Sequence, residues 1–308
     1  FDKLLLTTGS SAVRLKLPGA DLAGIYYLRT MEESTNLKKA LEQGGQLVVV
    51  GGGWIGLEVA SAARHYGASV VLFEPQPTPL YAVLGQELGE FYAQVHRDHG
   101  VDVRLGIGVN EFKGDGSSVR GVVASDGSEV PADVVVVGVG IRPNVELAAD
   151  AGLLVDDGIV VDEYLRTTDP DIFAAGDVAN AHNPHYGRHL RVQHWANAND
   201  QGPVAAKSML DLDEPFAKVP YFFSDQYDVG MEYSGMHGPG GYDDVVYRGD
   251  PATREFCVFW LKEGVVIAGM NVNVWDVHSD IRNLIKSRAK VDRAKLADPA
   301  VALAEVAP

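Results

Sequence analysis

The chain has 308 residues, enough for two or three domains with substantial cores. It carries 26 Lys and Arg against 42 Asp and Glu, a formal net charge of −16. This balance argues against nucleic acid and against an anionic membrane surface as partners. It allows a basic protein partner, or simply a solvated acidic surface.

We find no apolar run of the roughly 18 to 20 residues that a membrane span needs, and no signal-peptide or lipidation pattern. The single cysteine, Cys257, excludes an intramolecular disulfide and a Cys-x-x-Cys redox pair. It lies in an apolar run, so we expect a buried strand residue rather than a reactive thiol. These features predict a cytoplasmic protein with no membrane partner.

Hydrophobic periodicity predicts an alternation of strands and helices along the chain. The expected strands are 4–7, 47–50, 70–74, 101–105, 134–137 and 159–162, with a β-meander over 109–130. The expected helices are 31–43, one following Gly53, 84–99, 197–210 and 278–297. An antiparallel sheet is expected between 215 and 275, and frayed residues at the end of the chain. Pro203 should kink the fourth helix or delay its start.

The segment from Gln46 to Glu74 is the most informative one. An apolar strand leads into Gly51, Gly53 and Gly56, which fit G-x-G-x-x-G at a strand-to-helix turn, and a second β-branched run ends on Glu74. The glycines allow a tight turn, approach of a pyrophosphate and close helix packing, and the acid accepts from ribose hydroxyls. The pattern predicts a dinucleotide site, with a purely structural turn as the alternative.

Glu74 also predicts which nucleotide binds. A carboxylate accepts from the 2′- and 3′-hydroxyls and repels a 2′-phosphate, and no Lys or Arg occurs in 75–79. We therefore expect NADH rather than NADPH. The alternative is a solvated acid at a strand end.

A second pattern ends at Gly176-Asp177, where a short apolar strand delivers a carboxylate just past a glycine. Such a carboxylate suits a polyol hydroxyl, although Gly-Asp pairs are common. Four histidines follow between His182 and His194, but their spacing matches no zinc template. We expect a polar surface loop there and no metal site.

Further motifs occur at 6–10, 137–144, 193–202 and 221–227. Taken with the two patterns above, they resemble the flavoproteins with two dinucleotide domains. Within that group the chain resembles the ferredoxin reductase branch of the pyridine nucleotide-disulfide oxidoreductase superfamily, which includes the putidaredoxin and rubredoxin reductases. The resemblance covers essentially the whole chain.

The resemblance implies an α/β fold in which a Rossmann-like NAD domain is inserted in a split FAD domain, here N-terminally truncated, followed by an α+β C-terminal domain. The implied boundaries are 1–19 and 143–215 for the two FAD parts, 20–142 for the NAD domain and 216–308 for the reductase domain. The chain begins inside a predicted strand, and the ADP-binding first part of the FAD domain is missing from it. We therefore expect this chain by itself to hold FAD poorly.

The implied activity is that of an FAD-dependent oxidoreductase that passes electrons from NADH to a ferredoxin- or rubredoxin-like acceptor. The resemblance also allows a homodimer. Two alternatives stay open: a reductase of nitrite, monodehydroascorbate, peroxide or disulfide, and an NADH-binding signalling protein similar to apoptosis-inducing factor.

The resemblance also implies site residues. Glu58 would lie near the nicotinamide and Trp195 near the isoalloxazine ring, and both are the candidate catalytic residues. An acid favoured by the helix dipole in a first turn is the alternative for Glu58, and a core indole is the alternative for Trp195. The cofactor-binding residues implied are Thr8, Gly9, Arg14, Gly51, Gly53, Trp54, Ile55, Gly56, Glu58, Glu74, Gly138, Gly140, Gly176, Asp177, His194, Trp195 and Ala198.

Overall fold

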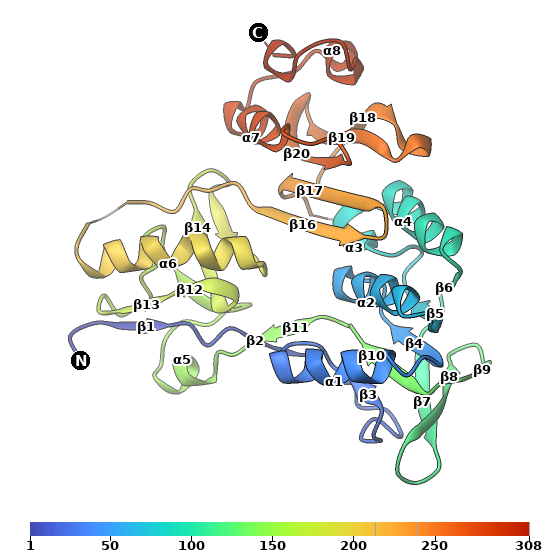
Figure 1. Cartoon of the computed structure of the whole chain (residues 1–308). Coiled ribbons are helices and arrows are strands. Elements are labelled where there is room, and N and C mark those ends of the chain that lie inside the picture. The colour runs from blue at the N-terminus through green and yellow to red at the C-terminus, as the bar shows by residue number, and fades with distance from the viewer. Residues whose placement is uncertain (213, 239, 308) are drawn as a thin grey trace. The chain divides into compact units, whose positions relative to one another are not determined.

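The computed structural model describes residues 1–212, 214–238 and 240–307, and it divides into two compact units (Figure 1). Unit 1 contains residues 1–11, 142–223 and those from 230 onward; unit 2 contains residues 12–141 and 224–229. Among the described residues, every helix is too short or too polar to span a lipid bilayer.

A five-stranded sheet forms the centre of unit 2, and all of its pairings are parallel. Its strands, in spatial order, are β3 (Ile25–Tyr26), β10 (Val134–Val137), β4 (Gln46–Val50), β5 (Ser69–Glu74) and β6 (Val101–Leu105). The β-branched run of β4 is buried on both faces, with Val48 and Val49 fully inaccessible, as a central parallel strand requires.

Helices cover one face of this sheet and a β-meander covers the other (Figure 1). The helices are α1 (Met31–Leu41), α2 (Trp54–His65), α3 (Tyr81–Leu84) and α4 (Gln86–Asp98). The meander consists of β7 (Val109–Gly114), β8 (Val119–Ala124) and β9 (Glu129–Pro131). Val50 and Phe73 of the sheet share one core with Phe112 and Val122 of the meander. Unit 2 is therefore a three-layer structure whose sheet carries the predicted nucleotide motif.

The helix predicted over 84–99 is confirmed as α4, but it begins at Gln86 and a separate short helix, α3, precedes it. Gly85 has a φ of 82° and separates α3 from α4. A left-handed residue cannot continue an α-helix, and glycine adopts this conformation at no steric cost.

The first part of unit 1 consists of two small sheets, one short helix and one long helix. Strand β1 (Leu4–Leu6) pairs in parallel with β13 (Ile172–Ala174), and a 3₁₀ turn (Gly176–Val178) follows β13. The other elements are β12 (Ile159–Val161), β14 (Ala179–Asn183), β15 (Arg188–Leu190), α5 (Glu146–Asp150) and α6 (Trp195–Met209). Ala174, Val178 and Ala205 are buried in a shared core, so α6 packs on the turn that carries Asp177.

Two predictions in this region are corrected. The histidine-rich stretch is not a loop: β14 and β15 form an antiparallel pair in which His182 lies opposite His189. The stretch is polar and lacks the alternation of apolar residues that predicts a strand, so the sequence did not indicate the hairpin. Pro203 does not delay its helix either, because α6 begins at Trp195 and runs through the proline to Met209.

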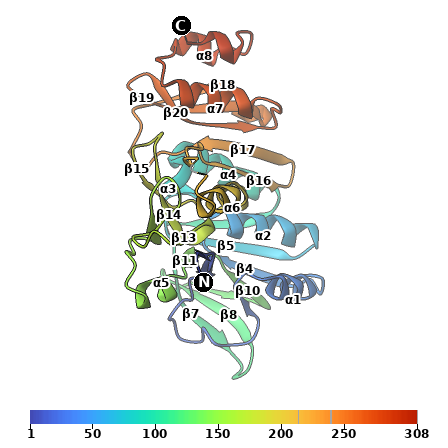
Figure 2. The ribbon, with the colours of Figure 1, turned by 90° about the vertical axis from the view of Figure 1, so that its left-hand side faces the viewer.

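The C-terminal part of unit 1 contains a five-stranded antiparallel sheet of order β16-β17-β20-β19-β18. Its strands are β16 (Tyr221–Gln226), β17 (Val229–Gly235), β18 (Asp244–Asp250), β19 (Glu255–Lys262) and β20 (Val265–Val272), with a 3₁₀ turn at Pro251–Thr253. Cys257 is buried in β19, as predicted. Helix α7 (His278–Ser287) packs on β20 (Figure 2).

The single helix predicted over 278–297 is wrong. Arg288 has a φ of 53° and ends α7, and Asp292 then caps a second helix, α8 (Arg293–Ala297). The expectation of frayed residues at the end is also wrong, because Leu303 and Val306 are buried around a 3₁₀ turn (Leu303–Glu305). Sequence patterns did not predict β2 (Ser10–Ala12) and β11 (Ile141–Pro143), which pair with each other.

Candidate cofactor sites

The nucleotide turn follows β4 in unit 2, and two of its glycines are required by the protein's own packing. Gly51 has a φ of 104°, and a Cβ there would lie 2.5 Å from the Gly138 carbonyl oxygen. A Cβ at Gly56 would lie 2.0 Å from the Gly51 carbonyl oxygen. Helix α2 thus approaches the end of β4 more closely than any side chain at 56 would permit.

Gly53 differs from these two glycines because a Cβ there would meet no close contact. Its φ is −78°, and the nearest atom to an added Cβ would be the Gly138 carbonyl oxygen at 3.9 Å. Gly53 is also the N-cap of α2, and it provides no side-chain cap for the first turn. The N-terminus of α2 therefore offers backbone N–H groups beside an open volume, which fits a diphosphate.

Glu74 is held against this turn. Its side chain is 8% exposed. Oε2 accepts from the Gly52 N–H at 2.6 Å and Oε1 accepts from the Gln76 N–H at 2.8 Å. The alternative of a solvated acid is wrong. Each carboxylate oxygen has a further lone pair, so acceptor capacity remains for a ribose.

The second glycine segment of unit 2 lies at the carboxyl end of β10, the strand next to β4. Gly138 donates its N–H to the Val50 carbonyl at 2.8 Å. Gly140 has a φ of 104°, and no atom lies within 4 Å of a Cβ built there. Ligands of open parallel sheets bind at the carboxyl ends of the strands, and both glycine segments lie at that edge.

Trp54 and Ile55 open helix α2. The Trp54 ring meets Tyr92 edge to face at 5.7 Å, and Ile55 is 40% exposed. Trp54 thus fixes α2 to α4, whereas Ile55 is the accessible one of the two.

Glu58 lies on α2, but the helix begins at Trp54, so Glu58 belongs to the second turn. The alternative of a first-turn acid is therefore wrong. The Ser224 hydroxyl donates to Glu58 Oε1 at 2.6 Å. Burial raises the pKa of Glu58, the Ser224 hydrogen bond opposes this, and the nearby charge of Asp225 adds to the rise.

In unit 1, the Gly176-Asp177 turn is held by side chains from distant segments. The Ser10 hydroxyl donates to Asp177 Oδ2 at 2.7 Å, and the Gly176 N–H donates to Gln201 Oε1 at 2.8 Å. A Cβ at Gly176, where φ is 82°, would face the Ala198 methyl at 3.7 Å. The loop and α6 therefore hold each other in register.

The Thr8-Gly9 turn of unit 1 is held by Asn144. The Thr8 hydroxyl donates to the Asn144 carbonyl at 2.6 Å, and the Asn144 amide donates to the Thr8 carbonyl at 2.8 Å. Gly9 has a φ of 63°, and its carbonyl accepts from the Asn144 N–H at 2.9 Å. Arg14, which the resemblance groups with this turn, belongs to unit 2, where its guanidinium lies over the Tyr27 ring at 4.7 Å.

Trp195 is the first residue of α6 and is 71% exposed, so the alternative of a core indole is wrong. His194 is the N-cap, and its Nδ1 accepts from the Ala196 N–H at 3.2 Å. Burial lowers the pKa of His194, which keeps this acceptor neutral. A large flat side chain at a helix N-terminus fits an electron-rich ring system.

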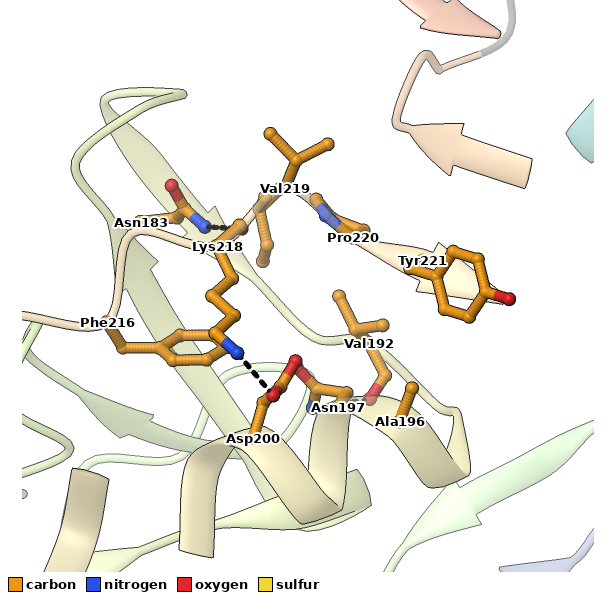
Figure 3. Close-up of a pocket in the computed structure, with 12 residues that line it drawn as sticks. Asn183, Val192, Ala196, Asn197, Asp200, Phe216, Lys218, Val219, Pro220 and Tyr221 are labelled. Atoms are coloured by element: carbon orange, nitrogen blue, oxygen red, sulfur yellow. Dashed lines mark hydrogen bonds and ion pairs between the residues drawn. The ribbon is translucent and has the colours of Figure 1, made fainter. Parts of the chain in front are cut away.

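A small cavity lies beside α6 (Figure 3). It encloses about 20 Å³, room for a single water molecule and not for a cofactor. Lys218 reaches across it to Asp200 of α6, and its carbonyl accepts from the Asn183 amide at 2.9 Å. The cavity therefore belongs to the support of α6.

Four polar residues that the sequence patterns left without a role hold these sites: Ser10, Asn144, Gln201 and Ser224. Asn144 and Gln201 lie inside recognised motifs, so that membership is the one signal that could have indicated them. Ser10 and Ser224 also lie inside recognised motifs, but their partners are more than 160 residues away, so motif membership did not indicate which residues they contact.

The residues present fit both a dinucleotide and a flavin: unit 2 has open space at Gly53 beside a fixed acid, and unit 1 has Asp177 and an exposed indole at the N-terminus of α6. Comparison with known proteins agrees. Residues 1–202 match the model of the family described as pyridine nucleotide-disulphide oxidoreductase, and residues 221–307 match the model described as reductase C-terminal.

Individual relatives point the same way. The chain is 40% identical over 310 residues to the ferredoxin--NAD(+) reductase component of an anthranilate 1,2-dioxygenase system from Burkholderia cepacia, covering 98% of this chain and 74% of that protein. It is 36% identical to putidaredoxin reductase of Pseudomonas putida over 311 residues, covering 99% and 73%.

A solved structure of the ferredoxin reductase for the CYP199A2 system from Rhodopseudomonas palustris matches with a TM-score of 0.95 and 36% identity, over 100% of this chain and 76% of that one. The predicted mixed α/β fold and the resemblance to ferredoxin reductases are thus confirmed. The chain belongs to the pyridine nucleotide-disulphide oxidoreductase family and is a flavin- and nicotinamide-dependent oxidoreductase.

Proposed function

We propose that this protein passes electrons from NADH through FAD to a small iron–sulfur protein of the ferredoxin type, or to a rubredoxin-like acceptor. Relatives support this proposal: several are named for a ferredoxin, and one is named a rubredoxin-NAD(+) reductase. A structural relative with a TM-score of 0.94 is a covalent complex of putidaredoxin reductase with putidaredoxin.

The observation that carries the proposal is the open volume at Gly53 beside the fixed Glu74. This arrangement is a nucleotide cradle rather than a packed turn. The sequence has one cysteine, and burial raises the pKa of Cys257 to about 11. That thiol is buried and protonated, so these 308 residues supply no dithiol for disulfide chemistry.

The protein's own groups have separate roles in the proposal. The N-terminus of α2 would hold the diphosphate of the nucleotide, and Glu74 would accept from its ribose. Glu58 would accept from the nicotinamide carboxamide. Asp177 would accept from the ribityl hydroxyls, and Trp195 would lie near the isoalloxazine. When bound, the two cofactors supply hydride transfer followed by the release of single electrons.

Three further expectations belong to the same proposal. The domain boundaries 1–19, 20–142, 143–215 and 216–308 describe an NAD domain within a split FAD domain. We also propose a cytoplasmic location and a homodimer. Limited proteolysis, cell fractionation and sedimentation equilibrium test these three points.

The test of the function is steady-state oxidation of NADH by the protein with excess FAD and different acceptors. Reduction of a [2Fe–2S] ferredoxin or a rubredoxin, with little turnover of a disulfide, nitrite or monodehydroascorbate, is the expected result. Preferred turnover of one of those three acceptors would overturn the proposal. Tight NADH binding without turnover of any acceptor would favour a signalling role similar to that of apoptosis-inducing factor.

A further inference from the structure

The tip of the β16–β17 hairpin, residues 224–229, belongs to unit 2 and contacts helices α2 and α4 there. Three polar side chains at this contact are buried, two from the hairpin tip and one from α4. Ser224 is 3% exposed, Gln226 1%, and His96 of α4 0%. A buried polar group costs free energy unless it is hydrogen-bonded. A buried network in which the polar side chains are hydrogen-bonded to one another therefore indicates that their positions matter.

These side chains form a continuous series of hydrogen bonds that ends at Glu58. Ser224 Oγ lies 2.6 Å from Glu58 Oε1, and Gln226 Nε2 lies 3.1 Å from Ser224 Oγ. Gln226 Oε1 lies 2.9 Å from His96 Nε2. The series continues from His96 Nδ1 to the Tyr227 hydroxyl at 3.2 Å.

The direction of every hydrogen bond follows from the chemistry of the groups. An ionised Glu58 only accepts, so the Ser224 hydroxyl must donate to it. The Gln226 amide nitrogen then donates to Ser224, which leaves the Gln226 oxygen as the acceptor for His96. His96 therefore carries its proton on Nε2, and its Nδ1 accepts from the Tyr227 hydroxyl.

The pKa values of His96 and Tyr227, the two members farthest from Glu58, agree with these donor and acceptor roles. Burial lowers the pKa of His96 to about 4, although the hydrogen bond with Gln226 opposes this effect, so the ring is neutral at pH 7. Burial raises the pKa of Tyr227 to about 12, although Arg64 opposes the rise, so the phenol keeps its proton. All four donors thus point toward Glu58, and each hydrogen bond polarises the next.

We propose that Ser224, Gln226 and His96 are positioning residues that hold Glu58 in its ionised form and in one orientation for the nicotinamide group. The inference rests on the proposed function, because it assigns a partner to the role of Glu58 there. Burial and the negative charge of Asp225 both disfavour the ionised form of Glu58, and both raise its pKa. The hydrogen bond from Ser224, at the end of the donor series, opposes these two effects.

The charged and titratable groups around the series come from three elements. Asp225 of the hairpin faces Glu58, and Arg64 of α2 faces Tyr227. His99 of α4 stacks on the Tyr227 ring at 3.8 Å, and its Nε2 lies 3.5 Å from Asp228 Oδ1. None of these is a cation beside Glu58, so neutral donors supply its stabilisation.

The test is the NADH dissociation constant of the protein, followed by fluorescence between pH 5 and pH 9. A hydrogen bond from a neutral donor to a carboxylate lowers its pKa, so removal raises it. In Ser224→Ala we expect the loss of NADH affinity on acidification to move upward by about one pH unit. Gln226→Leu, which cuts the series one step further away, should move it upward by less. Ser224→Thr keeps the hydroxyl and should restore the wild-type profile.

Ser61→Ala is the matched control. The Ser61 hydroxyl accepts from the Tyr227 N–H at 3.0 Å, so this change loosens the hairpin tip but removes none of the side-chain hydrogen bonds of the series. An unshifted profile in Ser61→Ala supports the inference. Equal shifts in Ser61→Ala and Ser224→Ala would show that the series only anchors the hairpin tip. An unshifted Ser224→Ala profile would overturn the inference. Failure of the proposed function looks different, because the wild type would then not bind NADH or not reduce an iron–sulfur acceptor at any pH.

Discussion

The nucleotide turn of unit 2 and the Gly176-Asp177 turn of unit 1 both follow the carboxyl end of a parallel strand, yet different neighbours hold them. Close backbone packing shapes the first, since Gly56 lies against the Gly51 carbonyl and Gly51 against the Gly138 carbonyl, and the side chain of Glu74 at the end of the neighbouring strand adds one hydrogen bond. Side chains from remote segments hold the second, through the hydroxyl of Ser10 and the amide of Gln201.

The two turns should therefore respond differently to substitution. Where backbone meets backbone, any side chain at the contact displaces an element, and the loss appears in stability. Where a side chain supports a loop, a substitution leaves one buried partner unpaired, and the loss is smaller and local. Gly53 belongs to neither case, because a Cβ there would make only an ordinary contact, 3.9 Å from the Gly138 carbonyl oxygen.

The largest expected effect comes from comparing substitutions at two glycines of the nucleotide turn, Gly53 and Gly56. Gly53→Val should weaken NADH binding at least about a hundredfold, because the side chain would occupy the open volume, and should leave the melting temperature within a degree or two of wild type. Gly56→Ala should instead lower the free energy of unfolding by about 3 kcal/mol, because its Cβ would overlap the Gly51 carbonyl oxygen. Isothermal titration with NADH and urea unfolding measure the two quantities.

The outcome that breaks the comparison is also defined. If Gly53→Val binds NADH as wild type does, the open volume is not the nucleotide site. If it unfolds as readily as Gly56→Ala, the two glycines are not distinct.

The same comparison explains how much could be predicted from the sequence. The nucleotide turn is specified within about thirty residues, because strand, glycines, helix and Glu74 follow each other along the chain. Its sheet and the meander beside it were predicted for the same reason. Asp177 was predicted as a position, but its support by Ser10 and Gln201 was not, since those contacts depend on tertiary packing.

Other omissions have the same cause. The hairpin tip at 224–229 joins α2 and α4 from more than 120 residues further along the chain, and no local pattern encodes that contact. The cap of α6 was missed because histidine is not among the preferred N-cap residues, and the helix was expected to begin two residues later. Helix ends at Gly85 and Arg288 depend on single left-handed residues, of which only the glycine is a recognised signal.

The next effect tests the side-chain support of the Asp177 turn. Gln201→Leu removes the acceptor of the buried Gly176 N–H and should lower the free energy of unfolding by about 1 to 3 kcal/mol, with a matching loss of FAD affinity. Gln94→Leu is the control, because Gln94 bonds Asp98 at the surface and should change stability by less than about 0.5 kcal/mol. Equal stability of the two variants in urea would show that the Gln201 contact is dispensable.

The smallest expected effect is the choice of nucleotide. NADH should bind at least about tenfold more tightly than NADPH, because a 2′-phosphate would meet the carboxylate of Glu74, and a tenfold ratio corresponds to about 1.4 kcal/mol. The neighbouring strand does hold a cation, Arg104, but its guanidinium pairs with Asp102 and lies over the Phe73 ring. The 2′-phosphate is therefore left without a compensating partner.

The two oxygens of Glu74 decide which variant isolates the charge. One accepts from the Gly52 N–H of the nucleotide turn and the other from the Gln76 N–H just after β5, so Glu74→Ala removes the charge and the support of the turn together and should weaken NADH binding as well. Glu74→Gln removes the charge and keeps one acceptor oxygen, although its amide nitrogen leaves one of the two N–H groups without an acceptor. It should bring the ratio of the NADPH and NADH dissociation constants toward unity while the melting temperature falls less than in Glu74→Ala. Equal dissociation constants in the wild type, or an unchanged ratio in Glu74→Gln, would show that another group selects the nucleotide and that Glu74 serves the turn alone.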